Sequence, residues 1–223
     1  TLQTTFNDYL SYSINEYKEV EPFTDFVARY YTYQVDDVEL VKYKQSDEII
    51  DDLDKYLNYY VERAEFVESF YEDEINYVDR EQINHLLHYK YDRLPLFERV
   101  EEIAEKLSSD FYDGSCKKKG TFRKLLKEHA NFKRDFKEIY KGFFLSPFCK
   151  VTLTEREIDK FIKKKVLYYE DALLFAYIKG VLAGFPYEQQ IKQVVIDEAQ
   201  DYNKLQYIII SKIFARADFT ILG

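Results

Sequence analysis

The chain has 223 residues, of which 46% are hydrophobic and 33% are charged, a balance that is typical of a globular protein. No run approaches the roughly 18 consecutive apolar residues of a membrane-spanning helix, so we expect no membrane partner. Cys116 and Cys149 are too few for a disulfide scaffold and too widely spaced for a compact zinc knuckle. Free thiols in a reducing, cytoplasmic setting are therefore the expectation.

Charge is distributed unevenly along the chain, whose formal net charge is −9. Residues 1–110 hold 27 acidic and 11 basic side chains, whereas residues 111–223 hold 14 acidic and 21 basic ones. An acidic surface repels phosphate backbones, so the first half is a poor platform for nucleic acid. Two interpretations stay open: a solvated helical surface, or a surface that docks onto a basic channel of a partner protein.

Taken in chain order, the sequence predicts a mostly helical protein. Residues 2–6 alternate weakly and carry threonines, which favours a strand. Apolar residues then recur at steps of three and four over residues 47–71 and again over residues 96–107, and each series predicts an amphipathic helix. A wider apolar stripe follows over residues 122–143 at broadly helical spacing.

The last third of the chain adds two expected helices and two expected strands. Thr154 and Glu157 have the spacing of a capping box, so a helix is predicted to begin there. A second helix is predicted over residues 168–183, where a following glycine ends it. Residues 193–197 and 219–222 are short apolar runs separated by a helix, which is typical of buried parallel strands.

These elements predict an α/β fold that is predominantly helical. About three strands, over residues 2–6, 193–197 and 219–222, would form part of the parallel sheet of a P-loop NTPase. Three strands are too few for a complete sheet of this kind, so the chain is expected to be a piece of a longer motor protein. The helical middle of the chain would then be a large insertion.

The clearest chemistry lies in residues 194–201, which read Val-Val-Ile-Asp-Glu-Ala-Gln-Asp. A strand that ends in adjacent acids places both carboxylates at the carboxyl edge of its sheet, where α/β folds bind ligands. There Asp197 can hold the magnesium ion of a bound nucleotide, and Glu198 can activate the water that attacks the γ-phosphate. Successive residues at a strand end point in different directions, so the two carboxylates can serve different tasks.

These residues resemble motif II of the UvrD/Rep-type superfamily 1 helicases, whose pattern is close to apolar-apolar-Asp-Glu-x-Gln-Asp. Gln200 stands where the DEAD and DEAH classes of superfamily 2 have another residue. Residues 169–174, Tyr-Glu-Asp-Ala-Leu-Leu, resemble the Asp-Leu-Leu helix that precedes motif II in the same family. Residues 219–223 resemble the strand that leads into motif III.

The resemblance implies an ATP hydrolase of the DNA helicase type as the full-length protein, with ATP and Mg²⁺ as its cofactors. It implies that Asp197 ligates the metal and that Glu198 is the catalytic residue. Gln200 would sense the γ-phosphate or couple the site to movement, and Asp201 would brace the motif.

A narrower resemblance is to the HelD-type branch, which is linked to RNA polymerase. Residues 4–9 resemble the end of the first core portion in that branch, and residues 167–171 and 177–180 resemble the return into the core. The expected partners are therefore DNA, RNA polymerase or both, with the acidic helical arm contacting protein. The implied division of the chain is a first core segment over residues 1–14, an inserted helical arm over 15–165, and a motor-core segment over 166–223.

The sequence lacks the Gly-x-x-x-x-Gly-Lys-Ser/Thr loop that cradles phosphates in such motors. The 223-residue chain alone is therefore expected to bind no ATP or Mg²⁺ and to be inactive. The favoured function is that of a superfamily 1 translocase that remodels nucleic-acid or RNA polymerase complexes. The alternative is a non-enzymatic docking arm that binds RNA polymerase. A nuclease or other two-carboxylate metal enzyme is disfavoured, because no further acidic cluster appears in motif form.

Two other groups of residues have weaker alternatives. His85 and His88 are three apart on an expected helix, a spacing that could hold zinc, but no recognisable third ligand accompanies them. Structural or surface histidines are the favoured interpretation. Residues 163–165 are three lysines close to Lys160, which could touch phosphate, although a solvated helix face is favoured.

Overall fold

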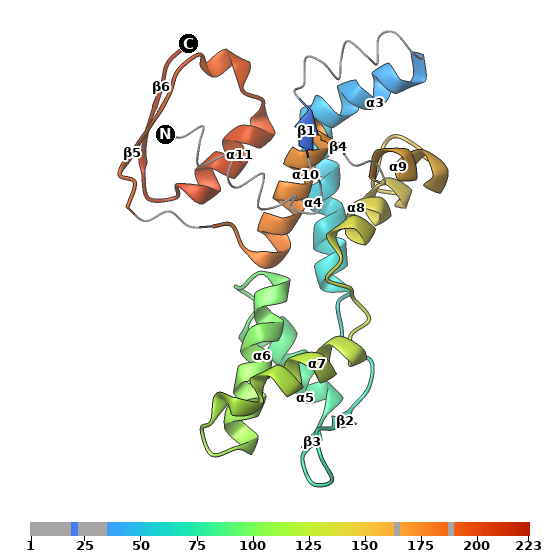
Figure 1. Ribbon diagram of the computed structural model, residues 1–223, viewed down its shortest axis with the longest axis vertical. Helices are drawn as coiled ribbons and strands as arrows, with labels where there is room; N and C mark the ends of the chain where they lie inside the picture. The colour runs from blue at the N-terminus through green and yellow to red at the C-terminus, as the bar shows by residue number, and fades with distance from the viewer. Residues whose placement is uncertain (1–18, 22–34, 163–165, 187–189) are drawn as a thin grey trace. The chain divides into compact units, whose positions relative to one another are not determined.

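The computed structural model describes residues 19–21, 35–162, 166–186 and 190–223 (Figure 1). The described chain is mostly helical with short strands, which confirms the predominantly helical α/β prediction. The expected strand over residues 2–6 and the lysine cluster over residues 163–165 lie outside the described residues.

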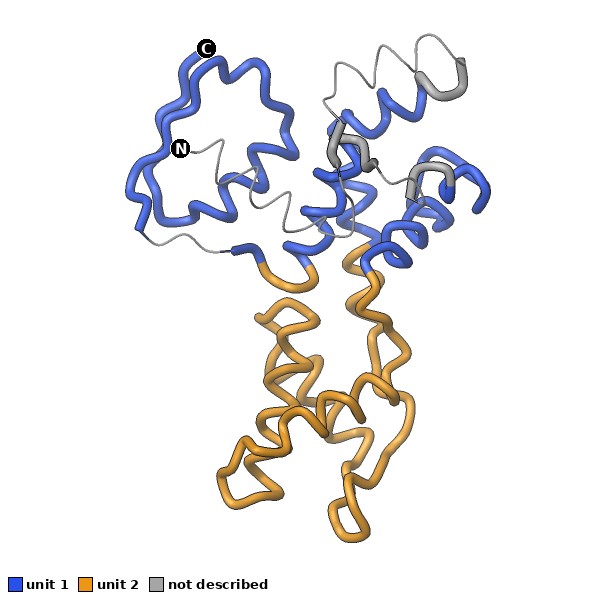
Figure 2. Tube along the Cα trace, viewed as in Figure 1, with its two compact units in different colours: residues 1–56, 136–181, 185–223 blue, residues 57–135, 182–184 orange. Residues whose placement is uncertain are grey.

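The chain divides into two compact units (Figure 2). Unit 1 comprises Thr1–Tyr56, Phe136–Val181 and Phe185–Gly223, and unit 2 comprises Leu57–Asp135 and Leu182–Gly184. Unit 1 is thus built from stretches of chain that lie on both sides of unit 2 in the sequence.

Among the described residues, unit 1 contains two pairs of parallel strands and most of the helices. Strand β1 (Glu19–Glu21) pairs with β4 (Val166–Tyr168), and β5 (Gln193–Ile196) pairs with β6 (Asp218–Ile221). The helices that begin in this unit are α3 (Val35–Gln45), α4 (Asp47–Glu62), α8 (Phe136–Leu145), α9 (Glu155–Ile162), α10 (Tyr169–Ala183) and α11 (Lys204–Ile213), with a 3₁₀ turn at Ala199–Asp201.

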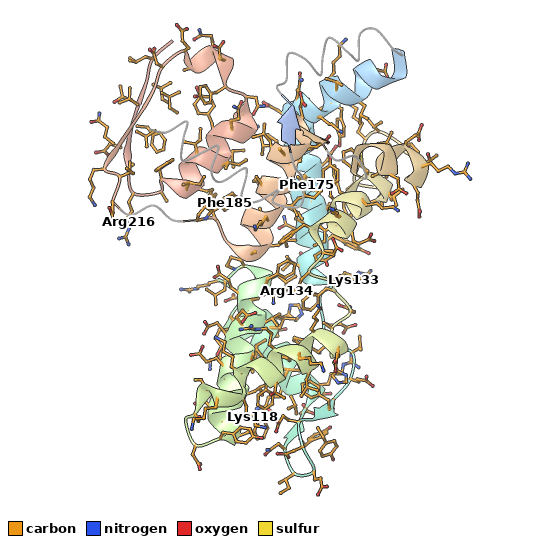
Figure 3. The ribbon with its side chains drawn as sticks, in the orientation of Figure 1. Lys118, Lys133, Arg134, Phe175, Phe185 and Arg216 are labelled. Carbon is orange, nitrogen blue, oxygen red and sulfur yellow. The ribbon has the colours of Figure 1, made fainter. Side chains whose placement is uncertain are left out.

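Helix α10 is the centre of the unit 1 core. It is apolar on all sides, which is typical of a helix that is buried all round, and every residue from Glu170 to Tyr177 is buried. The ring of Phe175 (Figure 3) stacks on Tyr140 of α8 with centroids 4.5 Å apart. Gly184 follows the helix with φ +91°, in the left-handed region where glycine is favoured, so the predicted end of this helix is confirmed.

The predicted capping box at the start of α9 is also confirmed. The Thr154 backbone N–H donates to Glu157 Oε2 at 2.7 Å, and the Glu157 N–H donates to Thr154 Oγ1 at 3.4 Å. These reciprocal bonds satisfy amides that the first turn of a helix leaves without intrahelical partners.

Unit 2 is built on the packing of α6 (Leu96–Phe111) against α7 (Lys119–His129). The apolar series predicted over residues 96–107 is buried along α6, so this amphipathic helix is confirmed. The other elements are the hairpin of β2 (Phe70–Tyr71) and β3 (Tyr77–Val78), helix α5 (Arg80–His85), a π-helical turn at Leu86–Lys90 and a 3₁₀ turn at Cys116–Lys118.

The helix predicted over residues 47–71 is too long, because α4 ends at Glu62. Phe66 instead forms an antiparallel bridge with Ala130. The amide of Asn84 accepts from the Phe66 N–H at 2.8 Å and donates to the Phe66 carbonyl at 2.9 Å. A side chain that satisfies both backbone groups removes the need for helical hydrogen bonds at this residue.

The expectation of only three strands is wrong as well. Strands β1 to β4 have two or three residues each, which is too short for an alternating pattern to be recognised. The apolar stripe over residues 122–143 is divided between α7 and α8, because residues 130–135 are not helical.

Candidate functional site

The candidate site lies at the carboxyl end of strand β5. Strands β5 and β6 run parallel in the register Gln193–Asp218 to Ile196–Ile221, so their carboxyl ends meet at one edge. Asp197 follows directly after β5, as the sequence predicts for a strand that ends in acids. Val194 and Ile196 are buried and Val195 is exposed, so the strand holds its register by burying one face.

The backbone reverses direction at Glu198, which has φ 51° and ψ 48°. A side chain other than glycine is uncommon in this left-handed region and costs on the order of 1 kcal/mol there. The Glu198 N–H donates to Asp197 Oδ1 at 3.0 Å, and the Asp201 N–H donates to the Glu198 carbonyl at 2.9 Å. Local hydrogen bonds thus hold a turn that keeps both carboxylates exposed.

Gln200 contacts the side chain of Glu198. Its Nε2 donates to Glu198 Oε2, which restricts the orientation of the Glu198 carboxylate. Asp197, Glu198 and Asp201 are all exposed at the same turn, and Asp201 ends the 3₁₀ turn that begins at Ala199. The four predicted residues therefore form one surface cluster rather than four separate positions.

Several residues that the sequence reasoning did not name hold this turn in place. The Tyr207 hydroxyl donates to the Ala199 carbonyl at 2.7 Å, and the Ala199 N–H donates to the Leu222 carbonyl at 2.9 Å. The side chains of Asn203 and Gln206 form a capping box at the start of α11. The Asn-x-x-Gln spacing is typical of a capping box and could have predicted this cap. No sequence pattern predicts the Tyr207 contact.

The exposed carboxylates suit a magnesium ion that is brought by a substrate. Mg²⁺ usually keeps several waters and takes one or two protein carboxylates together with phosphate oxygens, and Asp197 offers one exposed carboxylate. No group of three or more His, Cys, Asp or Glu side chains within the described ranges could hold a metal ion by itself.

A second adjacent pair of acids, Glu170 and Asp171, is buried at the start of α10. Lys44 Nζ lies 2.6 Å from Asp171 Oδ1, and the Tyr140 hydroxyl donates to the same oxygen. Gln45 Nε2 donates to Glu170 Oε1 at 3.1 Å. Neither Glu170 Oε2 nor Asp171 Oδ2 has a hydrogen-bond partner in the described structure. Burial raises the pKa of the Glu170 carboxyl above its ordinary value.

His85 and His88, the pair considered for zinc, each contact a nearby residue. His88 Nε2 donates to the Ala64 carbonyl at 2.7 Å, because a carbonyl oxygen can only accept. The His85 ring stacks on Tyr89 with centroids 5.2 Å apart. Both cysteines are free, and burial raises the pKa of the Cys149 thiol. These contacts favour structural histidines over a zinc site.

Comparison with other proteins does not assign the chain to a family. Neither the protein-family models nor the curated proteins with which the sequence was compared give a match. Among the helices that the structure describes, none is long and apolar enough to cross a membrane. The function proposed below therefore depends on the motif and on the geometry of its turn.

Proposed function

We propose that this chain supplies the metal-binding and water-activating turn of a superfamily 1 ATP-dependent motor that remodels nucleic-acid or RNA polymerase complexes. The observation that supports the proposal is the position of Asp197 and Glu198 at the carboxyl end of β5, next to a parallel strand. Ligands of α/β folds bind at this edge of the sheet. The sequence Asp-Glu-x-Gln-Asp over residues 197–201 adds the resemblance to motif II.

Each side chain has a task in this proposal. Asp197 would hold Mg²⁺ together with oxygens of the nucleotide, and the ion would neutralise charge on the phosphates. Glu198 would accept a hydrogen bond from the attacking water and take its proton. Gln200 already donates to Glu198, so a change in the Gln200 contact would alter the orientation of the Glu198 carboxylate. Asp201 would brace the turn.

A phosphate cradle is the part of the site that this sequence does not contain. Glycine occurs six times and never in a Gly-x-x-x-x-Gly-Lys-Ser/Thr arrangement. Without backbone amides and a lysine around the β- and γ-phosphates, two carboxylates repel a nucleotide rather than bind it. The proposal therefore assigns ATP turnover to the chain only in combination with a phosphate loop from outside these 223 residues.

The test uses the protein in which this chain and a phosphate loop occur together. Glu198→Gln is expected to retain nucleotide binding and to lower ATP turnover by about 100-fold or more, because the amide cannot accept the proton of the water. Asp218→Asn is the control, since Asp218 is an exposed acid at the opposite end of the same strand pair. Phosphate release and binding of a fluorescent nucleotide are measured.

Two outcomes would contradict the proposal. Unchanged turnover in Glu198→Gln would remove this residue from its role, and an equal loss in Asp218→Asn would indicate a general effect of charge. The 223-residue chain by itself is expected to show no turnover. Substantial turnover that disappears on Asp197→Ala would show that the missing cradle is not required.

A docking arm is the second candidate, favoured by the acidic composition of residues 1–110. Such a surface would be attracted to a basic channel in RNA polymerase, and its binding would weaken as salt rises. The two functions can be separated, because docking does not depend on the catalytic carboxylate. Binding of Glu198→Gln to core RNA polymerase with unchanged affinity, in a protein with no ATP turnover, would favour the docking arm.

A further inference from the structure

Unit 2 has a recess between α6 and α7 that the proposed motor chemistry does not use. Its volume is about 300 Å³, at the lower end of the range of ligand pockets. The residues that line it come from α6, from α7 and from the segment that follows α7, and they are Val100, Gly120, Arg123, Lys124, Leu126, Lys127, Ala130, Phe132 and Arg134.

The floor of the recess is apolar. Val100 and Leu126 are buried, and Phe132 is 8% exposed. The Phe132 ring packs edge-on against Phe66, with centroids 5.9 Å apart. Gly120 contributes no side chain to the wall of the recess, and a Cβ atom added there would meet no atom within 4 Å. The floor can therefore take an aliphatic or aromatic side chain from a partner.

The rim carries more positive charge than its carboxylates neutralise. Arg123 and Arg134 share the carboxylate of Glu101, at 2.7 and 2.9 Å. Lys124 lies 3.9 Å from Glu128, and both of these side chains are largely exposed. Lys127 is exposed and forms no ion pair with a described residue. At the first recess four cations thus face the two carboxylates of Glu101 and Glu128, which leaves this rim attractive to anions.

A second recess, of about 340 Å³, continues past the two arginines. Arg123 and Arg134 line both recesses, and Phe97, Ala183 and the acids Glu98 and Glu101 complete the second one within unit 2. The Arg134 guanidinium (Arg134 is labelled in Figure 3) lies 5.1 Å from the centre of the Phe97 ring, a cation–π distance. Because Glu98 and Glu101 balance the two arginines in the second recess, the excess of positive charge lies at the first one.

The chemistry of the floor distinguishes a peptide from a nucleic acid. Proteins bind single strands by stacking bases on open aromatic faces along a basic groove. The aromatic side chain that lines the first recess, Phe132, is buried and offers no such face. An apolar floor beneath a cationic rim instead complements a peptide in which carboxylates flank an apolar side chain. Arginine can bind such carboxylates through two parallel hydrogen bonds.

We propose that the α6–α7 recess binds an acidic peptide segment of a partner protein, with one large apolar side chain on Val100, Leu126 and Phe132. The flanking carboxylates lie over Arg123, Lys127 and Arg134. This interaction goes beyond the proposed ATPase function and uses none of its residues.

The test measures fluorescence anisotropy of labelled peptides with the complete 223-residue chain. The probe is a peptide of aspartate and glutamate residues around one leucine, and the comparison peptide has serine in place of that leucine. The leucine peptide is expected to bind at least about tenfold more tightly than the serine peptide. Its affinity is expected to fall as salt rises, because the rim charges are exposed.

Two variants of the chain locate the binding. Gly120→Leu adds a side chain at the recess wall, where a Cβ atom meets no atom within 4 Å, and it replaces glycine in a helix; thermal stability should therefore not fall, while peptide affinity drops at least about tenfold. Lys127→Glu reverses a rim charge and should produce a similar loss. Lys90→Glu is the control, since Lys90 is an exposed cation of unit 2 that does not line the recess.

Three results would overturn the proposal. Equal affinity for the leucine and serine peptides would show that the floor takes no part, and retained affinity in Gly120→Leu would place the binding elsewhere. Tighter binding of a single-stranded or duplex oligonucleotide, lost in Lys127→Glu, would identify the surface as a nucleic-acid site.

Discussion

Two pairs of adjacent acids in this chain have opposite surroundings. Glu170 and Asp171 are buried at the start of α10, whereas Asp197 and Glu198 are exposed at the end of β5. The buried pair contacts Lys44, Gln45 and Tyr140, and the exposed pair contacts residues of its own turn. The comparison shows that an acidic dipeptide indicates chemistry only when the backbone keeps it accessible to a ligand.

The secondary structure around each pair explains this difference. Glu170 and Asp171 stand in the first turn of a helix that is apolar on all sides, so they are carried into the core with it. Asp197 and Glu198 follow a four-residue strand, and the left-handed conformation of Glu198 turns the chain back at once. A buried charge must be paired, whereas an exposed one is free to take a ligand.

The largest effect is expected from breaking the buried ion pair. Lys44→Met leaves the Asp171 carboxylate without its ammonium partner, and both side chains are only 1% exposed. The free energy of unfolding should fall by about 3–5 kcal/mol, as measured by urea denaturation. A loss of less than about 1 kcal/mol would mean that the Lys44–Asp171 contact contributes little to stability.

The double variant Lys44→Met with Asp171→Asn serves as the control. The asparagine removes the buried charge and still accepts the Tyr140 hydroxyl. Most of the stability lost in Lys44→Met should therefore return. A double variant that is less stable than the single one would show that the carboxylate is stabilised by groups other than Lys44.

A smaller and pH-dependent effect is expected at Glu170. Burial raises the folded-state pKa of this carboxyl above its unfolded value, so its contribution to stability is fully present below the unfolded pKa and is lost as pH rises through the folded pKa. Glu170→Gln should therefore be more stable than the unaltered chain at about pH 8, and this gain should shrink toward about pH 4.5. Thermal unfolding over this range is the measurement. A gain that is constant with pH would contradict the assignment.

The smallest effect on stability is expected at the exposed pair. Asp197→Asn retains the oxygen that accepts the Glu198 N–H, and it alters an exposed side chain. The free energy of unfolding should change by no more than about 0.5 kcal/mol. A loss as large as that of Lys44→Met would assign Asp197 a structural role and weaken the proposed site.

Local patterns in the sequence predicted those parts of the structure that depend on neighbouring residues. The helix at residues 96–107, the capping box of Thr154 and Glu157, and the position of Asp197 after β5 all follow from spacing within a few residues. The overlong helix at residues 47–71 shows the limit of this reasoning. Beyond Glu62 the backbone of Phe66 is bonded by the Asn84 side chain, which lies 18 positions further along the chain.

Contacts between distant residues could not be predicted in the same way. Lys44 is 127 positions from Asp171, and nothing near either residue indicates the other. The α6–α7 recess joins Val100 to Phe132 and Arg134, which no single periodic pattern contains. The sequence predicted an acidic arm from composition, but the charge that lines this recess is basic because folding gathers cations from α7 and the following segment.

The separation of Lys44 from Asp171 also affects biosynthesis. At about 5–20 residues per second, the ribosome needs on the order of 6–25 s to make the 127 positions between them. Residues 57–135, which form the body of unit 2, are synthesised entirely within that interval. Unit 1 must therefore wait without Asp171 and with an incomplete core while unit 2 is completed, and shortening that wait would reduce its exposure to chaperones and proteases.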